Sequence, residues 1–138
     1  MKRKTTPPPT TPLPTEAELA ILNILWATGP ATVREVHEAL AAKQIGYTTV
    51  LKQMQVMAEK GLLDRTERFR SHVYAAALPR EQTQRQLIGN LLHRAFDGSA
   101  SNLVLGALSA KRVSPAELTA IRQFLDHFEK AQFEKGTK

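Results

Sequence analysis

The sequence of 138 residues contains no cysteine. This absence excludes disulfide bonds, thiolate metal sites, iron–sulfur clusters and cysteine nucleophiles, and it is typical of proteins in a reducing cytosol. Aromatic residues make up only 6% of the chain against 42% hydrophobic residues, which predicts an aliphatic core. The longest apolar segment, 19–27, is too short to cross a membrane, and the basic N-terminus lacks the apolar stretch of a signal peptide. We therefore expect a cytoplasmic protein with no membrane insertion.

Motifs of catalysis and of cofactor binding are also missing. No glycine-rich phosphate loop is present, and the histidines lack the H-E-x-x-H spacing of a zinc site. The four histidines lie in four separate predicted elements: His37, His72, His93 and His127. We therefore predict no enzyme activity, no metal and no cofactor. A hydrolase with an unrecognised site remains as a distant alternative.

Helix-start signals organise the first half of the chain. The capping box, a Thr followed three residues later by Glu, occurs at Thr15 and again at Thr32. Apolar residues at helical spacing follow each box, and a third helix is predicted over 47–60. The side chains expected to face inward are Leu19, Leu22, Leu25 and Trp26 in the first helix, Val36, Ala39 and Leu40 in the second, and Val50, Met54 and Met57 in the third.

After Gly61 the hydrophobic period changes from that of a helix to that of strands. Residues 63–68 and 72–76 are predicted to form a hairpin around the loop Phe69-Arg70-Ser71, although the loop lacks the usual Gly, Asn or Pro. Three helices followed by a hairpin is the order of a winged helix-turn-helix. A small α+β module without a ligand is the alternative.

From residue 79 onward the chain is again predicted to be helical, in segments near 79–96, 101–110 and 115 onward. Apolar residues in the first and last segments form a stripe that needs a partner helix, and a lobe of this size is marginal alone. We expect this stripe to form a dimer interface, with burial inside one chain as the alternative. Its residues are Leu87, Leu91, Leu118, Ile121, Leu125 and Phe128.

The predicted organisation is therefore mainly α with a small β-hairpin wing. It comprises a disordered, basic, proline-rich arm (1–14), a winged-helix domain (15–78), a helical dimerisation domain (79–132) and a flexible tail (133–138).

The third helix has the residues of a DNA-reading helix. In a helix-turn-helix the second helix of the motif enters the major groove, and the outward face here carries Thr48, Thr49, Lys52 and Gln55. Lys donates to guanine, Gln pairs with adenine, and the Thr methyl contacts thymine. The hairpin adds Arg68 and Arg70, expected to share a strand face toward phosphates. An ordinary solvated face has the same composition and remains the alternative.

Charge supports DNA binding only mildly. The chain has a net charge of +6, but the excess is shared evenly. Residues 1–78 contain ten Lys and Arg against seven Asp and Glu, and residues 79–138 contain nine against six. The sequence thus leaves two hypotheses of different class: a dimeric sequence-specific repressor, and a winged-helix protein-interaction module that binds no DNA.

Several segments, in order along the chain, resemble the penicillinase-repressor family of bacterial regulators (BlaI/MecI/CopY type). They are T-E-A-E-L (15–19), I-L-W (24–26), G-P-A-T-V-R-E-V (29–36), Y-T-T-V-L (47–51), E-K-G-L-L (59–63), V-Y (73–74), F-D-G-S (96–99) and S-P-A-E-L (114–118). The resemblance implies a homodimer on a palindromic double-stranded DNA operator, repression of antibiotic-resistance or stress genes, and relief through a membrane-bound sensor metalloprotease.

The resemblance also implies roles for individual residues. Thr48, Thr49 and Lys52 match recognition-helix contact positions, and Arg70 matches a wing arginine that many relatives precede with Gly, where this chain has Phe69. The absence of cysteine excludes the copper-responsive branch. The bond cleaved in resistance repressors is Asn-Phe, and the matching dipeptide is Gly106-Ala107. We therefore expect a protease specific for Asn-Phe to leave this chain intact.

Overall fold

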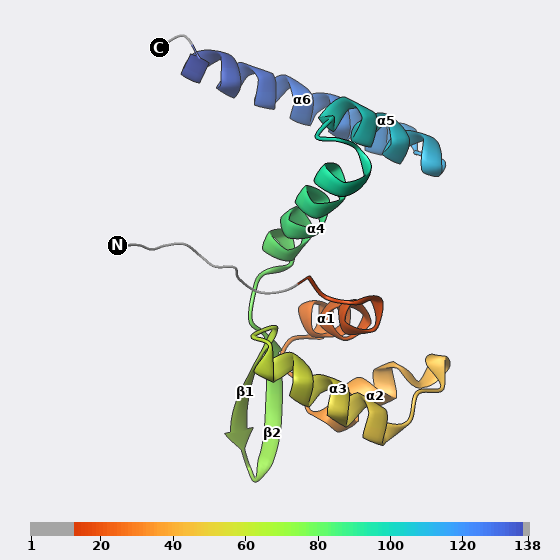
Figure 1. The fold of residues 1–138 in the computed structure, drawn as a ribbon, viewed down its shortest axis with the longest axis vertical. Coiled ribbons are helices and arrows are strands. Elements are labelled where there is room, and N and C mark those ends of the chain that lie inside the picture. Colours follow the sequence, from red (N-terminus) through yellow and green to blue (C-terminus); the bar gives the residue numbers. More distant parts are fainter. Residues whose placement is uncertain (1–12, 137–138) are drawn as a thin grey trace. The chain divides into compact units, whose positions relative to one another are not determined.

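A computed structural model describes residues 13–136 of the chain (Figure 1). Of the predicted arm 1–14, only Leu13 and Pro14 lie within the described residues, and Pro14 is buried. The elements are α1 (Glu16–Thr28), α2 (Val33–Ala39), the 3-10 helix η1 (Ala41–Lys43), α3 (Tyr47–Glu59), β1 (Leu63–Arg68), β2 (Ser71–Ala76), α4 (Arg80–Ala95), α5 (Ala100–Ala110) and α6 (Pro115–Gly136). They form two compact units, Met1–Asn90 and Leu91–Lys138, which divide within α4.

Both predicted capping boxes form. The backbone N–H of Glu18 donates to Thr15 Oγ1 at 3.1 Å, and the N–H of Thr15 donates to the Glu18 carboxylate at 2.9 Å. Thr32 and Glu35 make the same reciprocal pair at 3.2 and 2.9 Å. Each box satisfies two backbone donors that the helix itself leaves without partners, and so defines where α1 and α2 begin.

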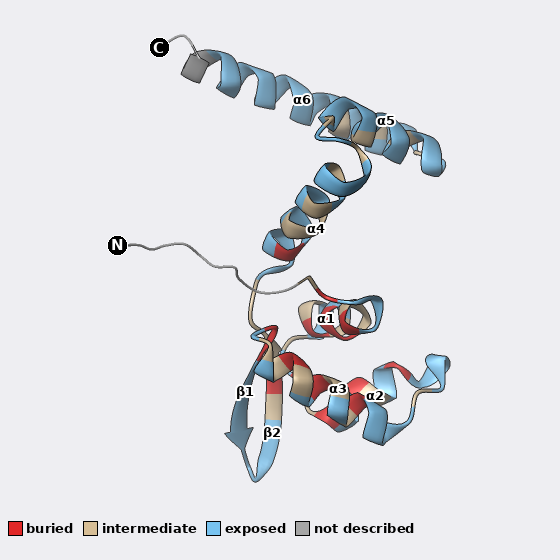
Figure 2. Ribbon diagram, in the orientation of Figure 1, coloured by how far each residue is buried: buried red, intermediate tan, exposed pale blue. Residues whose placement is uncertain are grey.

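The core of the first unit is aliphatic apart from Tyr74, in agreement with the composition (Figure 2). The inward stripe of α3 is confirmed, since Val50, Met54 and Met57 are at most 1% exposed. Ala39, which we expected to face inward, is exposed because it lies off the stripe that α2 buries. The core residues are Ile21, Leu22, Leu25, Ala31, Val33, Val36, Leu40, Val50, Met54, Met57, Leu62, Leu63 and Tyr74.

The two strands form an antiparallel hairpin from Leu63 opposite Ala76 to Arg68 opposite Ser71. Ser71 therefore belongs to β2 and not to the loop, because it pairs with Arg68. Ala31 exchanges two backbone hydrogen bonds with Tyr74, at 2.9 and 2.8 Å, which joins the α1–α2 connection to the hairpin. Three helices followed by this attached hairpin form the predicted winged helix-turn-helix.

A partly buried ion pair joins the first turn of α1 to the C-terminal end of α3. Lys60, at the C-terminal end of α3, donates to the Glu18 carboxylate at 2.6 Å, and the Glu18 side chain is only 2% exposed. Burial by itself would raise the pKa of Glu18. The hydrogen bond and positive charge of Lys60, with the hydrogen bonds from Thr15, outweigh it and lower this pKa below its ordinary value.

The start of α4 is attached to α1 through Trp26. The indole N–H of Trp26 donates to the Leu78 carbonyl at 2.9 Å, and the Arg80 guanidinium lies 5.8 Å from the centre of an indole ring. Thr83, in the first turn of α4, is buried. The chain therefore leaves the winged helix along a defined path.

The second unit has helices but no buried core. The hydroxyls of Ser99 and Ser114 cap α5 and α6 by accepting from Asn102 and Glu117, each at 3.1 Å. Yet none of residues 91–133 is buried, as Figure 2 shows by the absence of red in α5 and α6. Local hydrogen bonds and capping therefore define these helices, whereas packing inside one chain contributes little.

Candidate DNA-binding surface

The outward face of α3 presents the predicted base-reading side chains together. Thr48, Thr49, Lys52 and Gln55 are all exposed, on the side opposite the buried Val50, Met54 and Met57. The first three line one surface hollow, whereas Gln55 lines a second hollow between α3 and β1. Among the described residues Lys52 has no ion-pair partner, so its ammonium group is available to an incoming ligand.

The N-terminus of α3 differs from those of α1 and α2. Its N-cap is Gly46, which offers no side-chain hydrogen bond, whereas Thr15 and Thr32 cap the other two helices. The backbone N–H groups of its first turn are therefore open to an acceptor from outside, and a phosphate suits such a helix end by charge and geometry.

Tyr47, the first residue of α3, lies next to this surface, and the sequence predicts no role for it. It is 46% exposed, and its ring meets the ring of His37 edge to face at 5.7 Å between centroids. This contact joins α2 to the start of α3 across the turn of the helix-turn-helix. Only the pairing of the two helices reveals it, because an isolated Tyr at a helix start has no distinctive pattern.

The wing ends in an unusual turn. Phe69 and Arg70 are its two central residues, with φ of +51° and +64°. A type I′ hairpin turn requires this left-handed conformation of both, and Asn-Gly is the usual choice. For other residues the conformation costs roughly 1–2 kcal/mol each. Arg70 therefore lies in the turn, so our argument that Arg68 and Arg70 share a face of one strand does not apply. Both side chains are nevertheless exposed.

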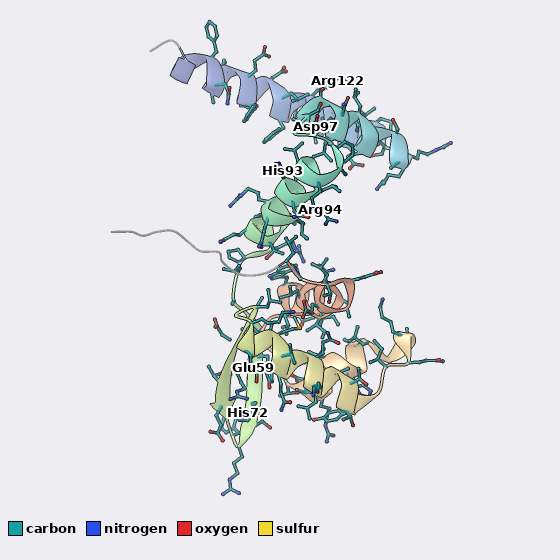
Figure 3. The ribbon with its side chains drawn as sticks, in the orientation of Figure 1. Glu59, His72, His93, Arg94, Asp97 and Arg122 are labelled. Carbon is teal, nitrogen blue, oxygen red and sulfur yellow. The ribbon has the colours of Figure 1, made fainter. Side chains whose placement is uncertain are left out.

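Negative charge limits where phosphates can approach. The hollow between α3 and β1 is lined by two carboxylates and one guanidinium, and Figure 3 shows Glu59 in α3 beside the wing that carries His72. Its residues are Gln55, Ala58, Glu59, Leu63, Asp64 and Arg65. A phosphate is repelled from this hollow. The exposed Arg68 and Arg70 of the wing lie outside this hollow and are the better phosphate contacts.

A second surface, on residues 91–133, is apolar. Leu91, Leu125 and Phe128 of the predicted stripe are 46%, 54% and 52% exposed. Phe124 stacks on Phe128 with centroids 5.9 Å apart and is itself largely exposed. Leu118 and Ile121 are half-buried, as is Leu87, which belongs to the first unit. Val104 and Leu105 of α5 are also exposed.

Comparison with known proteins identifies the family. The model of the penicillinase repressor family matches residues 14–127. The chain is 34% identical over 116 residues to the transcriptional regulator BlaI of Mycobacterium tuberculosis, with 83% of each chain covered. The chain belongs to the penicillinase repressor family. The repressor is thus a DNA-binding transcriptional regulator and not an enzyme, which decides between the two hypotheses of the sequence analysis.

Solved structures resemble the repressor more distantly. Transcriptional regulator Tm0710 from Thermotoga maritima is 18% identical with a TM-score of 0.46, over 90% of this chain and 80% of its own. The PcaV transcriptional regulator from Streptomyces coelicolor is 20% identical with a TM-score of 0.46, over 87% and 77%. At this level of similarity, these structures give no information on the ligand or the assembly of the repressor.

Within residues 13–136, the repressor has no cluster of metal-ligating side chains and no helix long and apolar enough to span a membrane. The described histidines lie far apart in the sequence, with His72 on the wing and His93 in α4 (Figure 3).

Proposed function

We propose that the repressor binds a two-fold symmetric operator as a homodimer, with one α3 in each half-site. The observation that carries the dimer is the second unit, which exposes large apolar side chains and buries none of residues 91–133. Removing this apolar surface from water stabilises the protein that buries it. A second copy of the same face is the simplest cover, because most oligomers are symmetric dimers with self-complementary interfaces.

Under this proposal the residues divide into two tasks. Residues 15–78 bind DNA: Thr48, Thr49, Lys52 and Gln55 contact base edges, and Arg68 and Arg70 contact the backbone. Residues 79–132 form the dimer, through Leu87, Leu91, Leu118, Ile121, Leu125 and Phe128. A dimer also sets the operator symmetry, with half-sites about one helical turn or a multiple of it apart. Since its ligand is DNA, this proposal places the repressor in the cytoplasm.

The proposal also concerns how repression is relieved. A membrane-bound sensor metalloprotease is the partner that the family resemblance implies, and Gly106 and Ala107 of α5 occupy the position of the cleaved bond. Both residues are exposed in the single chain. Because a dimer interface would cover the apolar face of α5, we propose that cleavage there requires local opening of the lobe and a protease whose specificity is not for Asn-Phe.

Selection of DNA tests the proposal. The full-length protein is used to select duplexes from a random library, and the mass of the complex with a selected duplex is measured by sedimentation. We expect an inverted-repeat sequence and two chains per duplex, and a free protein of about twice 15.3 kDa. A duplex with one half-site replaced by random sequence should bind much more weakly. One chain per duplex, or no preference for a symmetric sequence, would contradict the proposal.

A further inference from the structure

The tip of the wing combines two features that do not stabilise the free chain. Phe69 is 91% exposed, more than any other large hydrophobic residue that the structure describes. Its backbone, with that of Arg70, is left-handed, which disfavours every residue except Gly and, to a lesser degree, Asn or Asp. The Arg68 guanidinium lies 5.7 Å from the centroid of its ring.

Both the exposure and the strain are unfavourable in isolation. A ring in water gains nothing from the hydrophobic effect, and Gly or Asn would form the same two-residue turn with less strain. A conformation of this kind points to an interaction that the free chain lacks. The ligand must then offer an apolar surface against which the ring packs. It must also offer negative charge to the guanidinium groups of Arg68 and Arg70, the neighbours of Phe69 in the sequence.

The minor groove of DNA offers both. Phe is among the apolar side chains that architectural proteins insert between base steps from the minor groove, and the negative potential of a narrow minor groove attracts Arg. The hairpin follows α3 after only three residues, 60–62, so a duplex that receives α3 in its major groove passes close to the wing. Figure 1 shows the turn as the free end of the hairpin, away from α1, α2 and α3.

We propose that Phe69 is a minor-groove contact of the repressor, with its ring seated against a base step that flanks the half-site and with Arg68 and Arg70 directed to the phosphates on either side. This inference rests on the proposed function, because it requires that α3 enter the adjacent major groove. It assigns a DNA contact to the residue at which this chain replaces the Gly of many relatives.

The test compares variants that separate the ring from the turn. Phe69→Asn removes the ring but keeps a residue that tolerates the left-handed conformation. Phe69→Leu keeps an apolar side chain without the aromatic face. Binding is measured on a duplex selected from random DNA by the unaltered full-length protein. The minor groove of that duplex is probed by hydroxyl-radical footprinting, which reports access to the deoxyribose.

We expect Phe69→Asn to bind the selected duplex about tenfold more weakly, which is the loss typical of one specific contact. The salt dependence should stay unchanged, because the ring carries no charge. Minor-groove protection flanking the half-site should disappear, while the melting temperature of the protein should stay equal or rise as strain is relieved. Phe69→Leu should retain part of the affinity and of the protection.

Two results would overturn the inference while leaving the proposed function intact. One is wild-type affinity of Phe69→Asn for the selected duplex, as expected if the ring instead meets another protein or a lipid surface. The other is weaker binding with an unchanged footprint, which would mean that the ring acts through the shape of the wing. Failure of the unaltered protein to select any duplex would instead refute the proposed function itself.

Discussion

The ion pair between Glu18 and Lys60 can be tested without disturbing the helix cap that Glu18 also makes. Gln serves as well as Glu at the third helical position of a capping box, so Glu18→Gln keeps the hydrogen bond to Thr15 and removes the charge. Glu35→Gln is the matched control. It makes the same change in the box of α2, where Glu35 is exposed and pairs only with Thr32.

The magnitude follows from the geometry. Hydrogen bonds that involve charged groups contribute about 1.5–3 kcal/mol, and this one is short at 2.6 Å and buried on the Glu18 side. Lys60 keeps 32% of its side chain in solvent, so water replaces the Oε2 acceptor that the substitution removes, while the single Gln oxygen stays with the N–H of Thr15. We therefore expect Glu18→Gln to lower the free energy of unfolding by about 1–2 kcal/mol. In a unit of this size each kcal/mol corresponds to roughly 4–8 °C in melting temperature. The control should lose less than about 0.5 kcal/mol.

The pH dependence has a definite sign. A carboxyl group whose pKa is lower in the folded state stabilises the fold above its unfolded pKa, about 4.3 for Glu. This contribution disappears as the pH falls through the folded pKa. The pKa of Glu18 is lowered in this way. The advantage of the unaltered protein over Glu18→Gln should thus be complete at neutral pH and shrink below about pH 4.

Urea unfolding followed by the fluorescence of Trp26 measures the effect in the intact chain. Trp26 is the only tryptophan and lies in α1, the helix whose first turn contains Glu18. Protein concentration is held equal, because association shifts apparent stability. The reasoning is refuted if Glu18→Gln and Glu35→Gln are equally destabilising at neutral pH, or if the difference between them persists at about pH 3.

Three further predictions concern binding, assembly and helix stability. Lys52→Ala should weaken the binding free energy for a selected duplex by about 1–3 kcal/mol and relax the sequence specificity of the protein. Arg70→Ala should weaken binding to all DNA and lower the salt slope by about one. Titrations at several salt concentrations measure both effects, and equal losses on selected and random duplexes for both variants would contradict the prediction. Phe128→Glu should convert the dimer to a monomer in sedimentation, while Lys130→Glu, on the opposite side of α6, should not. Gly106→Ala should raise the free energy of unfolding by about 0.5–1 kcal/mol in urea titrations followed by circular dichroism, because the added Cβ meets Phe96 only at an ordinary 3.6 Å; a decrease would show a tighter site.

The local structure of the winged helix could be predicted from the sequence alone. The capping boxes at Thr15 and Thr32 and the inward stripe of α3 all appear in the structure as expected. Each involves residues three to seven positions apart, and the geometry of one helix turn brings such residues together whatever the rest of the chain does. The face that carries Thr48, Thr49 and Lys52 then follows, because it lies opposite the buried stripe.

The turn of the wing needed the tertiary structure. Its sequence lacks Gly and Asn, so a three-residue loop was the natural expectation. The pairing of Arg68 with Ser71 instead confines the turn to Phe69 and Arg70 and imposes a conformation that neither prefers. The strand register is set by burial of Leu63 and Tyr74 against the helices. The energy of the core therefore outweighs the preference of two exposed residues.

Long-range pairs were likewise decided only by the fold. Glu18 and Lys60 lie 42 residues apart, and Trp26 and Leu78 lie 52 apart. Neither pair has a pattern that a sequence reveals, because one Lys or one carbonyl looks like many others until packing brings a particular one within reach. The sequence alone therefore predicts which helices form and, for α3, which face is buried. Which polar groups meet depends on how separate elements pack, and only the folded chain shows it.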